Sequence, residues 1–293
     1  MYGDIMERAI YNALFAAQSP DGRYLRYHTS VEGRRVYFDR DTYCCPGNFR
    51  RIIAELPEMI YYKADKGIAI NLYTTSQAEL TLSSGLTLKI SQETEYPASG
   101  KVLLRLEPAQ AATFPVLLRI PRWCREIKIS VNGTPIKETI TPGTFFNLTR
   151  NFKQGDEIHL EMTMDWRFVK GRKVNEGLVA LMRGPSLFCL ALNRIRQWQQ
   201  CGLNDASPMS IKPDTLKGPY TDNSYRPGGL ISEIEGLRPG EGEYPAWGCR
   251  EMIMQLTEYV DPAGEMVYFK LLEPTNVKPV DDELIFKPSK TGG

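Results

Sequence analysis

The sequence predicts a mainly β protein in which an antiparallel β-sandwich region is preceded by a short helical segment. From Gly67 onward, short apolar runs recur between turn residues, a spacing typical of sandwich strands. Before that point, two stretches carry apolar residues at helical spacing. Hydrophobic residues make up 42% and charged residues 24% of the chain, an ordinary globular composition. The length of 293 residues suggests about two domains.

The helical segment contains two expected helices. The first covers residues 4–17, with Asp4 as its N-cap and the turn sequence Ser19-Pro20-Asp21-Gly22 as its stop. The second follows Cys45-Pro46, and Pro57 should kink or break it because proline cannot donate a backbone hydrogen bond. Its apolar stripe consists of Phe49, Ile52, Ile53, Leu56 and Ile60. Residues 23–28 and 36–38 between the helices look like short strands.

The strand series gives the expected domain division. Strands are expected at 68–73, 78–82, 86–90, 101–106, 115–120, 127–131, 144–148, 157–162 and 178–182. The run 127–131 leads into Asn132-Gly133, the strongest two-residue hairpin signal. One sandwich domain is therefore predicted over residues 66–194, after a helical part over 1–65. In 195–293, an irregular segment up to about 245 precedes strands at 252–256 and 266–272, which complete the sandwich or form a small second one.

Charge and hydropathy exclude several classes of function. The 36 Lys and Arg residues balance the 35 Asp and Glu residues, for a net charge of +1, so the basic excess of a general nucleic-acid binder is absent. No apolar run approaches the roughly 20 residues of a membrane helix, so we expect no membrane association. The first eight residues lack the basic-then-apolar order of a secretory signal, which leaves the cytoplasm as the default location.

The six cysteines are too sparse for a disulfide framework. Cys124 and Cys189 lie in apolar runs and are expected to be small core residues. Cys201 and Cys249 lie in polar, turn-rich sequence and are assigned no role.

The adjacent pair Cys44-Cys45 is the most chemically suggestive feature. Pro46 suits the first position of a helix, which places Cys45 at the cap and Cys44 just before it. The positive end of the helix dipole favours a thiolate there, and thiolates are both metal ligands and nucleophiles. Two neighbouring buried thiols without a function are the alternative. The pair alone is a weak zinc signal, since a closed zinc site needs four ligands.

Several sequence blocks occur in the order found in one enzyme family. They are Cys44-Cys45-Pro46-Gly47-Asn48 followed by Arg50-Arg51-Ile52-Ile53-Ala54, the stretch 2–12, Ala69-Ile70-Asn71-Leu72-Tyr73, Leu117-Leu118-Arg119-Ile120-Pro121-Arg122-Trp123, Val131-Asn132-Gly133, Phe152-Lys153-Gln154-Gly155-Asp156, and the stretch 179–185. In combination they resemble glycoside hydrolase family 127, the β-L-arabinofuranosidase group. The resemblance covers residues 1–194 well and the remainder weakly.

This resemblance implies a fold and a mechanism. Members have an (α/α)6 barrel followed by β-sandwich domains, so residues 1–65 resemble the end of such a barrel. They are retaining glycosidases in which a cysteine replaces the usual carboxylate nucleophile. By this pattern Cys44 is the catalytic nucleophile and a zinc ligand, and Cys45 is a second zinc ligand. The implied cofactor is Zn²⁺, held by three cysteines and one glutamate. A separate glutamate is the acid/base, and the implied substrate is a β-L-arabinofuranosyl carbohydrate.

The chain also departs from the family pattern. The third cysteine and the ligand glutamate lie upstream of the dicysteine in the family, in a Glu-x-Cys arrangement, and no cysteine precedes Cys44 here. Glu7 and Glu32 do not match the acid/base or ligand motifs. We therefore expect a C-terminal portion of a family enzyme, with little activity alone and a poor zinc site, because two thiolates lack the other two ligands.

A non-enzymatic function is the alternative. The chain would then be a β-sandwich accessory module that packs on a catalytic domain or binds carbohydrate. Trp123, Trp166, Trp198 and Trp247 would serve either as a sugar-stacking platform or, as we favour, as core and loop anchors. On either reading, the apolar faces of the two helices are expected to pack on the sandwich or to pair between chains, which would give a homo-oligomer.

Overall fold

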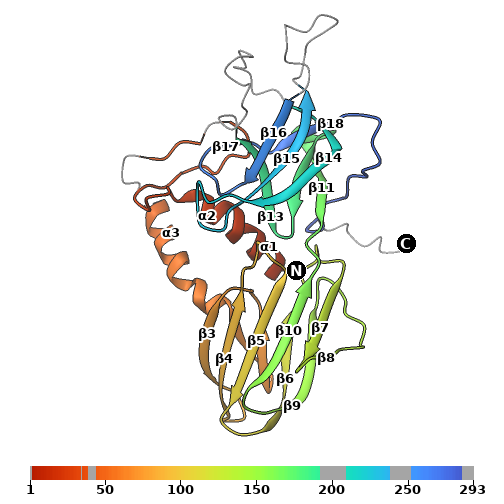
Figure 1. The fold of residues 1–293 in the computed structure, drawn as a ribbon. Helices are drawn as coiled ribbons and strands as arrows, with labels where there is room; N and C mark the ends of the chain where they lie inside the picture. Colours follow the sequence, from red (N-terminus) through yellow and green to blue (C-terminus); the bar gives the residue numbers. More distant parts are fainter. Residues whose placement is uncertain (1, 34, 39–43, 192–208, 238–251, 286–293) are drawn as a thin grey trace, which may run out of the picture. The chain divides into compact units, whose positions relative to one another are not determined.

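The computed structural model describes residues 2–33, 35–38, 44–191, 209–237 and 252–285. The chain divides into two compact units, one formed by Met1–Glu7 with Cys44–Asp165 and the other by Arg8–Tyr43 with Trp166–Gly293. Most of the regular structure is strand, which confirms the predicted mainly β class (Figure 1).

The first unit begins with α1 (Tyr2–Arg8), whose last residue already belongs to the second unit. Its second helix, α3, covers Cys44–Glu55 and continues as a 3-10 turn over Leu56–Met59. The α-helical pattern stops two residues before Pro57, as expected for a residue that lacks the backbone N–H. Because α3 begins at Cys44, Cys45 lies within the first turn rather than at the predicted cap position.

Two sheets form the sandwich of the first unit. The four-stranded sheet has the order β1 (Tyr61–Ala64), β2 (Gly67–Ile70), β6 (Ala112–Arg119) and β9 (Phe145–Phe152). The six-stranded sheet has the order β3 (Ser76–Thr81), β4 (Thr87–Thr94), β5 (Lys101–Pro108), β10 (Asp156–Met162), β7 (Ile127–Val131) and β8 (Thr134–Pro135). All pairings are antiparallel except that of β2 with β6, which is parallel.

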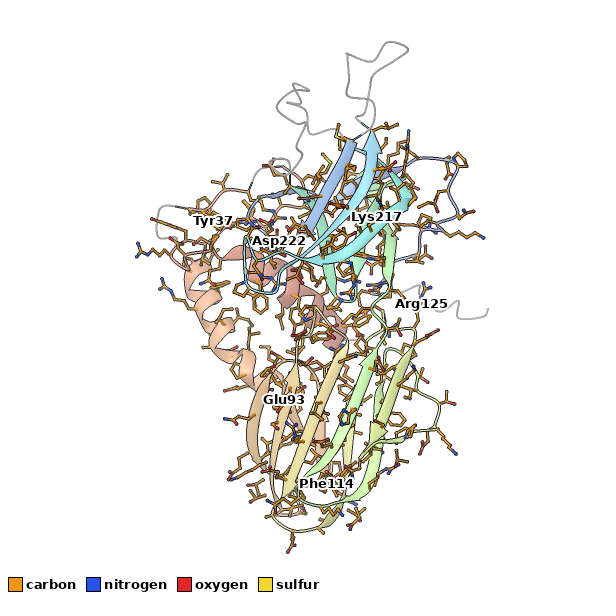
Figure 2. The ribbon with its side chains drawn as sticks, viewed as in Figure 1. Tyr37, Glu93, Phe114, Arg125, Lys217 and Asp222 are labelled. Carbon is orange, nitrogen blue, oxygen red and sulfur yellow. The ribbon has the colours of Figure 1, made fainter. Side chains whose placement is uncertain are left out.

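Alternating burial along the strands builds the core of this sandwich. Leu88 on β4, Leu104 on β5 and Ile158 on β10 are fully buried, while the residues between them face outward. In the other sheet, the rings of Phe114, labelled in Figure 2, and Phe152 lie 5.1 Å apart. The predicted hairpin is confirmed: β7 pairs with β8, and Asn132 and Gly133 both have the positive φ of a type I′ turn, 49° and 77°.

The second unit contains the remainder of the first helix and a larger sheet. The helix continues as a π-helical stretch over Ala9–Leu14 and ends in α2 (Phe15–Ala17), so residues 4–17 are helical as predicted. Asp4, however, lies inside α1 and not at its cap. The eight-stranded sheet has the order β11 (Trp166–Lys170), β12 (Val179–Arg183), β18 (Tyr268–Leu271), β14 (Ser210–Thr221), β15 (Leu230–Leu237), β16 (Met252–Glu258), β13 (Ser186–Ala191) and β17 (Gly264–Met266). An additional pairing of β12 with β13 closes six of these strands into a ring.

This grouping of strands differs from the one based on sequence. The sequence grouped the strand at 178–182 with the sandwich over 66–194, whereas β12 and β13 pair with strands of residues 252–271, and β11 pairs with β12. Alternation along one strand shows which side is buried but not which sheet it joins, because pairing is a long-range property. The stretch 195–245 was expected to be irregular, yet it contains β14 and β15.

Residues 23–28 and 36–38 are not strands, contrary to expectation. They contribute an isolated bridge between Gln18 and Leu25 and a hydrogen bond from the Phe38 amide to the Leu25 carbonyl, 2.9 Å long. A strand needs a continuous partner, and this segment has none among the described residues. None of the described helices is long and apolar enough to cross a membrane.

Candidate functional site

The dicysteine pair opens helix α3 and faces outward. Cys44 is exposed and Cys45 is half-buried, and their Sγ atoms lie 3.4 Å apart. Two thiols on successive residues of a helix normally diverge, because successive residues are about 100° apart around its axis. The short Sγ–Sγ distance therefore means that both thiols lie close together at the N-terminus of the helix. The helix dipole favours negative charge there.

This arrangement fits half of a zinc site. Two Zn–S bonds of about 2.3 Å in tetrahedral geometry place their sulfur atoms roughly 3.8 Å apart. The observed separation of 3.4 Å is close enough that small rotations of the side chains would suit a shared ion. A closed site needs four ligands, and the described residues contain no group of three or more His, Cys, Asp or Glu that could hold a metal ion.

The apolar stripe behind the pair is only partly covered. Phe49, Ile52, Ile53 and Leu56 are all half-buried, and no residue of α3 is fully buried. The first helix, in contrast, buries Ile10 and Ala16. Ile5, Ala9 and Ala13 of the first helix are nevertheless exposed, so the apolar face of each helix is covered only in part.

The other described cysteines are unsuited to nucleophilic catalysis. Cys124 and Cys189 are fully buried, which confirms the expectation that they are core residues. Burial raises the pKa of each thiol to about 12, so both are protonated near neutral pH. Cys201 and Cys249 lie outside the described residues, and both histidines are exposed.

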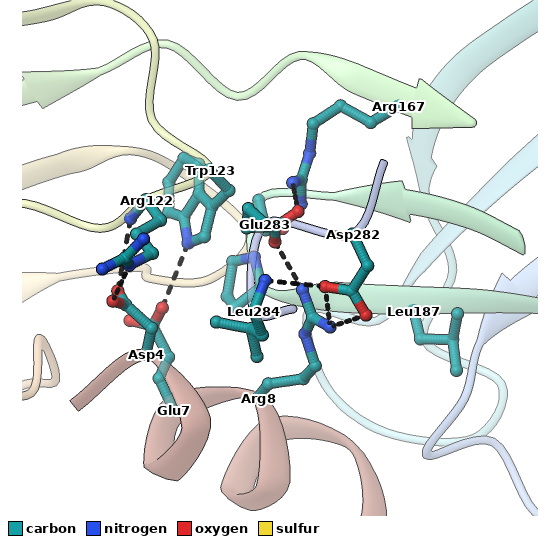
Figure 3. A network of polar contacts seen from close by, with 12 residues as sticks. Asp4, Glu7, Arg8, Arg122, Trp123, Arg167, Leu187, Asp282, Glu283 and Leu284 are labelled. Atoms are coloured by element: carbon teal, nitrogen blue, oxygen red, sulfur yellow. Dashed lines mark hydrogen bonds and ion pairs between the residues drawn. The ribbon is translucent and has the colours of Figure 1, made fainter. Parts of the chain in front are cut away.

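Glu7 belongs to a buried polar network in the first unit that sequence reasoning did not find (Figure 3). Its carboxylate accepts hydrogen bonds from the Tyr96 hydroxyl at 2.5 Å, from Trp123 Nε1 at 3.0 Å and from Arg119. Arg119 also forms an ion pair with Asp4 at 3.1 Å. The network fastens the first turns of α1 to the end of β6 and the residues after it, so Glu7 has a structural role. Trp123 is buried within it and unable to stack on a sugar.

A second polar network lies within the second unit (Figure 3). Arg8 pairs with Asp282 at 2.8 Å and with Glu283, and Arg167 pairs with Glu283 at 2.9 Å.

Glu32 also has a structural role, because its carboxylate accepts hydrogen bonds from the Val267 and Tyr268 amides. Burial raises the pKa of Glu32, but its bonds to the backbone are those of a structural residue.

A cavity of about 420 Å³ lies on the outer face of the six-stranded sheet. Its side chains are mainly polar or charged and come from β3, β4 and β5: Gln77, Glu79, Lys89, Ser91, Arg105 and Glu107. Arg105 is held by Glu157 at 2.9 Å and by Glu93, and these two carboxylates raise the pKa of its guanidinium. The cavity thus offers a fixed hydrogen-bond donor beside several acceptors, and both can form hydrogen bonds with the hydroxyl groups of a ligand.

Two sequence models of one family match the chain. They are described as "Beta-L-arabinofuranosidase, GH127 catalytic domain", over residues 1–58, and "Beta-L-arabinofuranosidase, GH127 middle domain", over residues 67–164. The "Non-reducing end beta-L-arabinofuranosidase" of Bifidobacterium longum subsp. longum is 31% identical over 209 residues, which are 64% of this chain and 31% of that protein. The chain belongs to glycoside hydrolase family 127.

Solved structures of family 127 have the same fold. The β-L-arabinofuranosidase from Geobacillus stearothermophilus is 26% identical, with a TM-score of 0.78, and covers 92% of this chain. A second family 127 β-arabinofuranosidase is 25% identical, with a TM-score of 0.77 and the same coverage. The chain spans 46% of each of these proteins and about a third of the Bifidobacterium relative. It corresponds to the end of the family's catalytic domain together with the middle domain.

Proposed function

We propose that this chain is the part of a retaining, β-L-arabinofuranosidase-like glycoside hydrolase that carries the cysteine nucleophile. The observation that supports this most is the Cys44–Cys45 pair, whose Sγ atoms lie 3.4 Å apart at the start of α3. The pair falls in the stretch matched by the family's catalytic domain. Its substrate would be an arabinose-containing carbohydrate, as the relatives' names indicate.

In this proposal, the Cys44 Sγ attacks the anomeric carbon of the sugar. The glycosidic C–O bond breaks, and the leaving oxygen takes a proton from a general acid. Water, activated by the same group acting as a base, then breaks the thioglycosidic bond and restores the configuration of the sugar. Cys44 is well placed for attack because its side chain is exposed, in contrast to the buried Cys124 and Cys189.

Zinc would be held by Cys44 and Cys45 together with ligands from outside the described residues, and it would keep the sulfur as thiolate. The described residues of this chain supply only two such ligands, and Glu7 and Glu32 are engaged in structural hydrogen bonds. We therefore propose that the 293-residue chain alone has little glycosidase activity.

Two measurements on the purified chain test this proposal. We expect far less than one zinc ion per chain, and release of nitrophenol from an aryl β-L-arabinofuranoside no faster than with Cys44→Ser. If the chain binds about one zinc ion and turns over the substrate, while Cys44→Ser does not, the claim that it needs further residues is wrong. If both proteins release nitrophenol at the same rate and clearly faster than the uncatalysed reaction, Cys44 is not the nucleophile.

The cavity on the outer face of the six-stranded sheet favours a second candidate function, carbohydrate binding by the sandwich. A volume of about 420 Å³ is within the range of small-molecule sites. Titration with arabinose oligosaccharides, followed by NMR, would then shift the amides of β3 to β5, and Arg105→Ala would abolish the shifts. Lys128→Ala, an exposed residue of the same sheet on β7, is the matched control. Unchanged spectra at millimolar sugar would exclude this function.

A further inference from the structure

Two arginines of the second unit are buried without a carboxylate partner. Arg26 and Arg35 lie in the segment between α2 and α3, and only 3% and 7% of their surface is exposed. Among the described residues, neither forms an ion pair. Buried charges are ordinarily paired, because removing a charge from water is strongly unfavourable. Two buried arginines that form no ion pair among the described residues therefore require an explanation.

Each guanidinium group is held by a tyrosine and by neutral acceptors. Arg26 lies 4.6 Å from the centre of the Tyr37 ring and donates a hydrogen bond to its hydroxyl at 2.5 Å (Figure 2 labels Tyr37). Arg35 lies 4.0 Å from the centre of the Tyr259 ring. It donates to the main-chain carbonyls of Tyr259 and Asp261 and, at 3.5 Å, to the Cys189 Sγ. These contacts fix the orientation of both groups.

Three guanidinium nitrogen atoms of this pair have no acceptor. They are Nε and Nη1 of Arg26 and Nε of Arg35, all buried. The two guanidinium groups belong to one cluster, since both act electrostatically on Tyr259 and Cys189 and they repel each other. Buried donors without acceptors are rare in folded proteins, so three within one charged cluster mark a place that favours an acceptor group.

Among the described residues, no carboxylate forms an ion pair with either guanidinium group. Burial raises the pKa of the Cys189 thiol to about 12 and also raises the pKa of Tyr259, so both groups are neutral. The Asp261 carboxylate accepts hydrogen bonds from the Thr257 hydroxyl and the Ala263 amide, both at 2.9 Å, while Arg35 is bonded to the Asp261 main chain. The Asp261 charge acts on the same cluster, but it makes no direct ion pair with either guanidinium group among the described residues.

We propose that Arg26 and Arg35 form a binding site for a small oxyanion, which accepts hydrogen bonds from these three nitrogen atoms. Carboxylates and tetrahedral oxyanions both suit this role, because the planar guanidinium presents two parallel donors that match their oxygen atoms. This site is separate from the dicysteine pair and does not depend on the proposed glycosidase function.

The test measures the thermal stability and binding heat of the purified chain with single anions. Sulfate, phosphate, acetate and galacturonate are compared with chloride at constant ionic strength, which separates tetrahedral from carboxylate ligands. We expect one of them to raise the melting temperature above the chloride value and to bind at about one ion per chain. Arg23→Gln, an exposed arginine of the same segment, should respond like the wild type.

Two variants of Arg26 decide the outcome. Arg26→Gln should weaken binding at least about tenfold. Arg26→Met removes the buried charge, so in anion-free buffer it should be as stable as the wild type or more stable, and it should gain nothing from the anion. If no anion exceeds chloride, or if Arg26→Gln responds like the wild type, the site does not exist. A large loss of stability in Arg26→Met without anion would show that Arg26 is already compensated within the protein, and would also overturn the proposal.

Discussion

Replacing Glu7 by alanine should strongly destabilise the first unit. The Glu7 side chain is 1% exposed and is bonded to Arg119, Tyr96 and Trp123, while the Arg119 side chain is 4% exposed. Removing one partner of a buried ion pair leaves the other charge uncompensated, which typically costs about 3–5 kcal/mol. Asp4, the second acid beside Arg119, remains in place, so we expect a loss near 3 kcal/mol, the lower end of this range.

The control is a pair of the same kind on the surface. Glu79 is 61% exposed and lies 3.6 Å from Lys89, so Glu79→Ala should change the free energy of unfolding by less than about 1 kcal/mol. Glu7→Gln keeps the size and an acceptor oxygen but loses the charge, and should cost about 2 kcal/mol.

Urea unfolding followed by tryptophan fluorescence measures these differences, with Trp123 inside the network as one reporter. With a slope of about 2 kcal/mol per molar urea, a loss of about 3 kcal/mol lowers the unfolding midpoint by about 1.5 M. The reasoning is refuted if Glu7→Ala unfolds within about 0.3 M of the wild type, or if Glu79→Ala loses as much.

Three further predictions test other parts of the structure. At pH 8, iodoacetamide should modify Cys44 and Cys45 in the folded protein and leave Cys124 and Cys189 unmodified until the protein unfolds. The reason is that burial raises the pKa of the Cys124 and Cys189 thiols to about 12. Peptide mass spectrometry that found Cys189 labelled as strongly as Cys44 would contradict this assignment. Leu104→Ala should cost about 2–5 kcal/mol and Leu103→Ala, its half-buried neighbour, clearly less; a reversed order in denaturant unfolding would show that the register of β5 is wrong. Gly133→Ala should destabilise the protein by about 1 kcal/mol, because the φ of Gly133 is 77°. Gly47→Ala in α3 is the control and should not destabilise it, although an added Cβ has free space at both sites. Equal effects of the two substitutions in thermal melts would disprove the role of φ.

Local features of the fold were predictable from the sequence, because they depend on neighbours along the chain. The strands of the sandwich follow from alternation, the β7–β8 turn from Asn132-Gly133, and the end of α3 from Pro57. Strand β15 could also have been found, since Leu230, Ser232 and Ile234 alternate inward, but Gly and Pro residues on both sides obscured it. The parallel pairing of β2 with β6 joins residues about 50 positions apart and leaves no local signal.

The candidate site was predictable only in part, for a similar reason. Adjacent cysteines before a proline indicate a helix N-terminus with two thiols, and the structure places them there. The role of Glu7 depends on Arg119, which is 112 positions away, and nothing near Glu7 in the sequence points to it. The pairing of Arg35 with Tyr259 joins residues 224 positions apart, so the buried arginines were not predicted.

The claim that Cys44 is the nucleophile can be tested most directly by trapping the sugar on it. For this experiment, the upstream part of the catalytic domain of the Bifidobacterium relative is fused before Tyr2 to supply the remaining groups. After rapid acid quenching during turnover, mass spectrometry should find one pentosyl unit on the peptide that contains Cys44. Cys44→Ser should lose both the adduct and the activity, and Cys45→Ser should lose activity with its zinc. An active fusion that carries its sugar on a carboxylate, or that remains active as Cys44→Ser, would contradict the account.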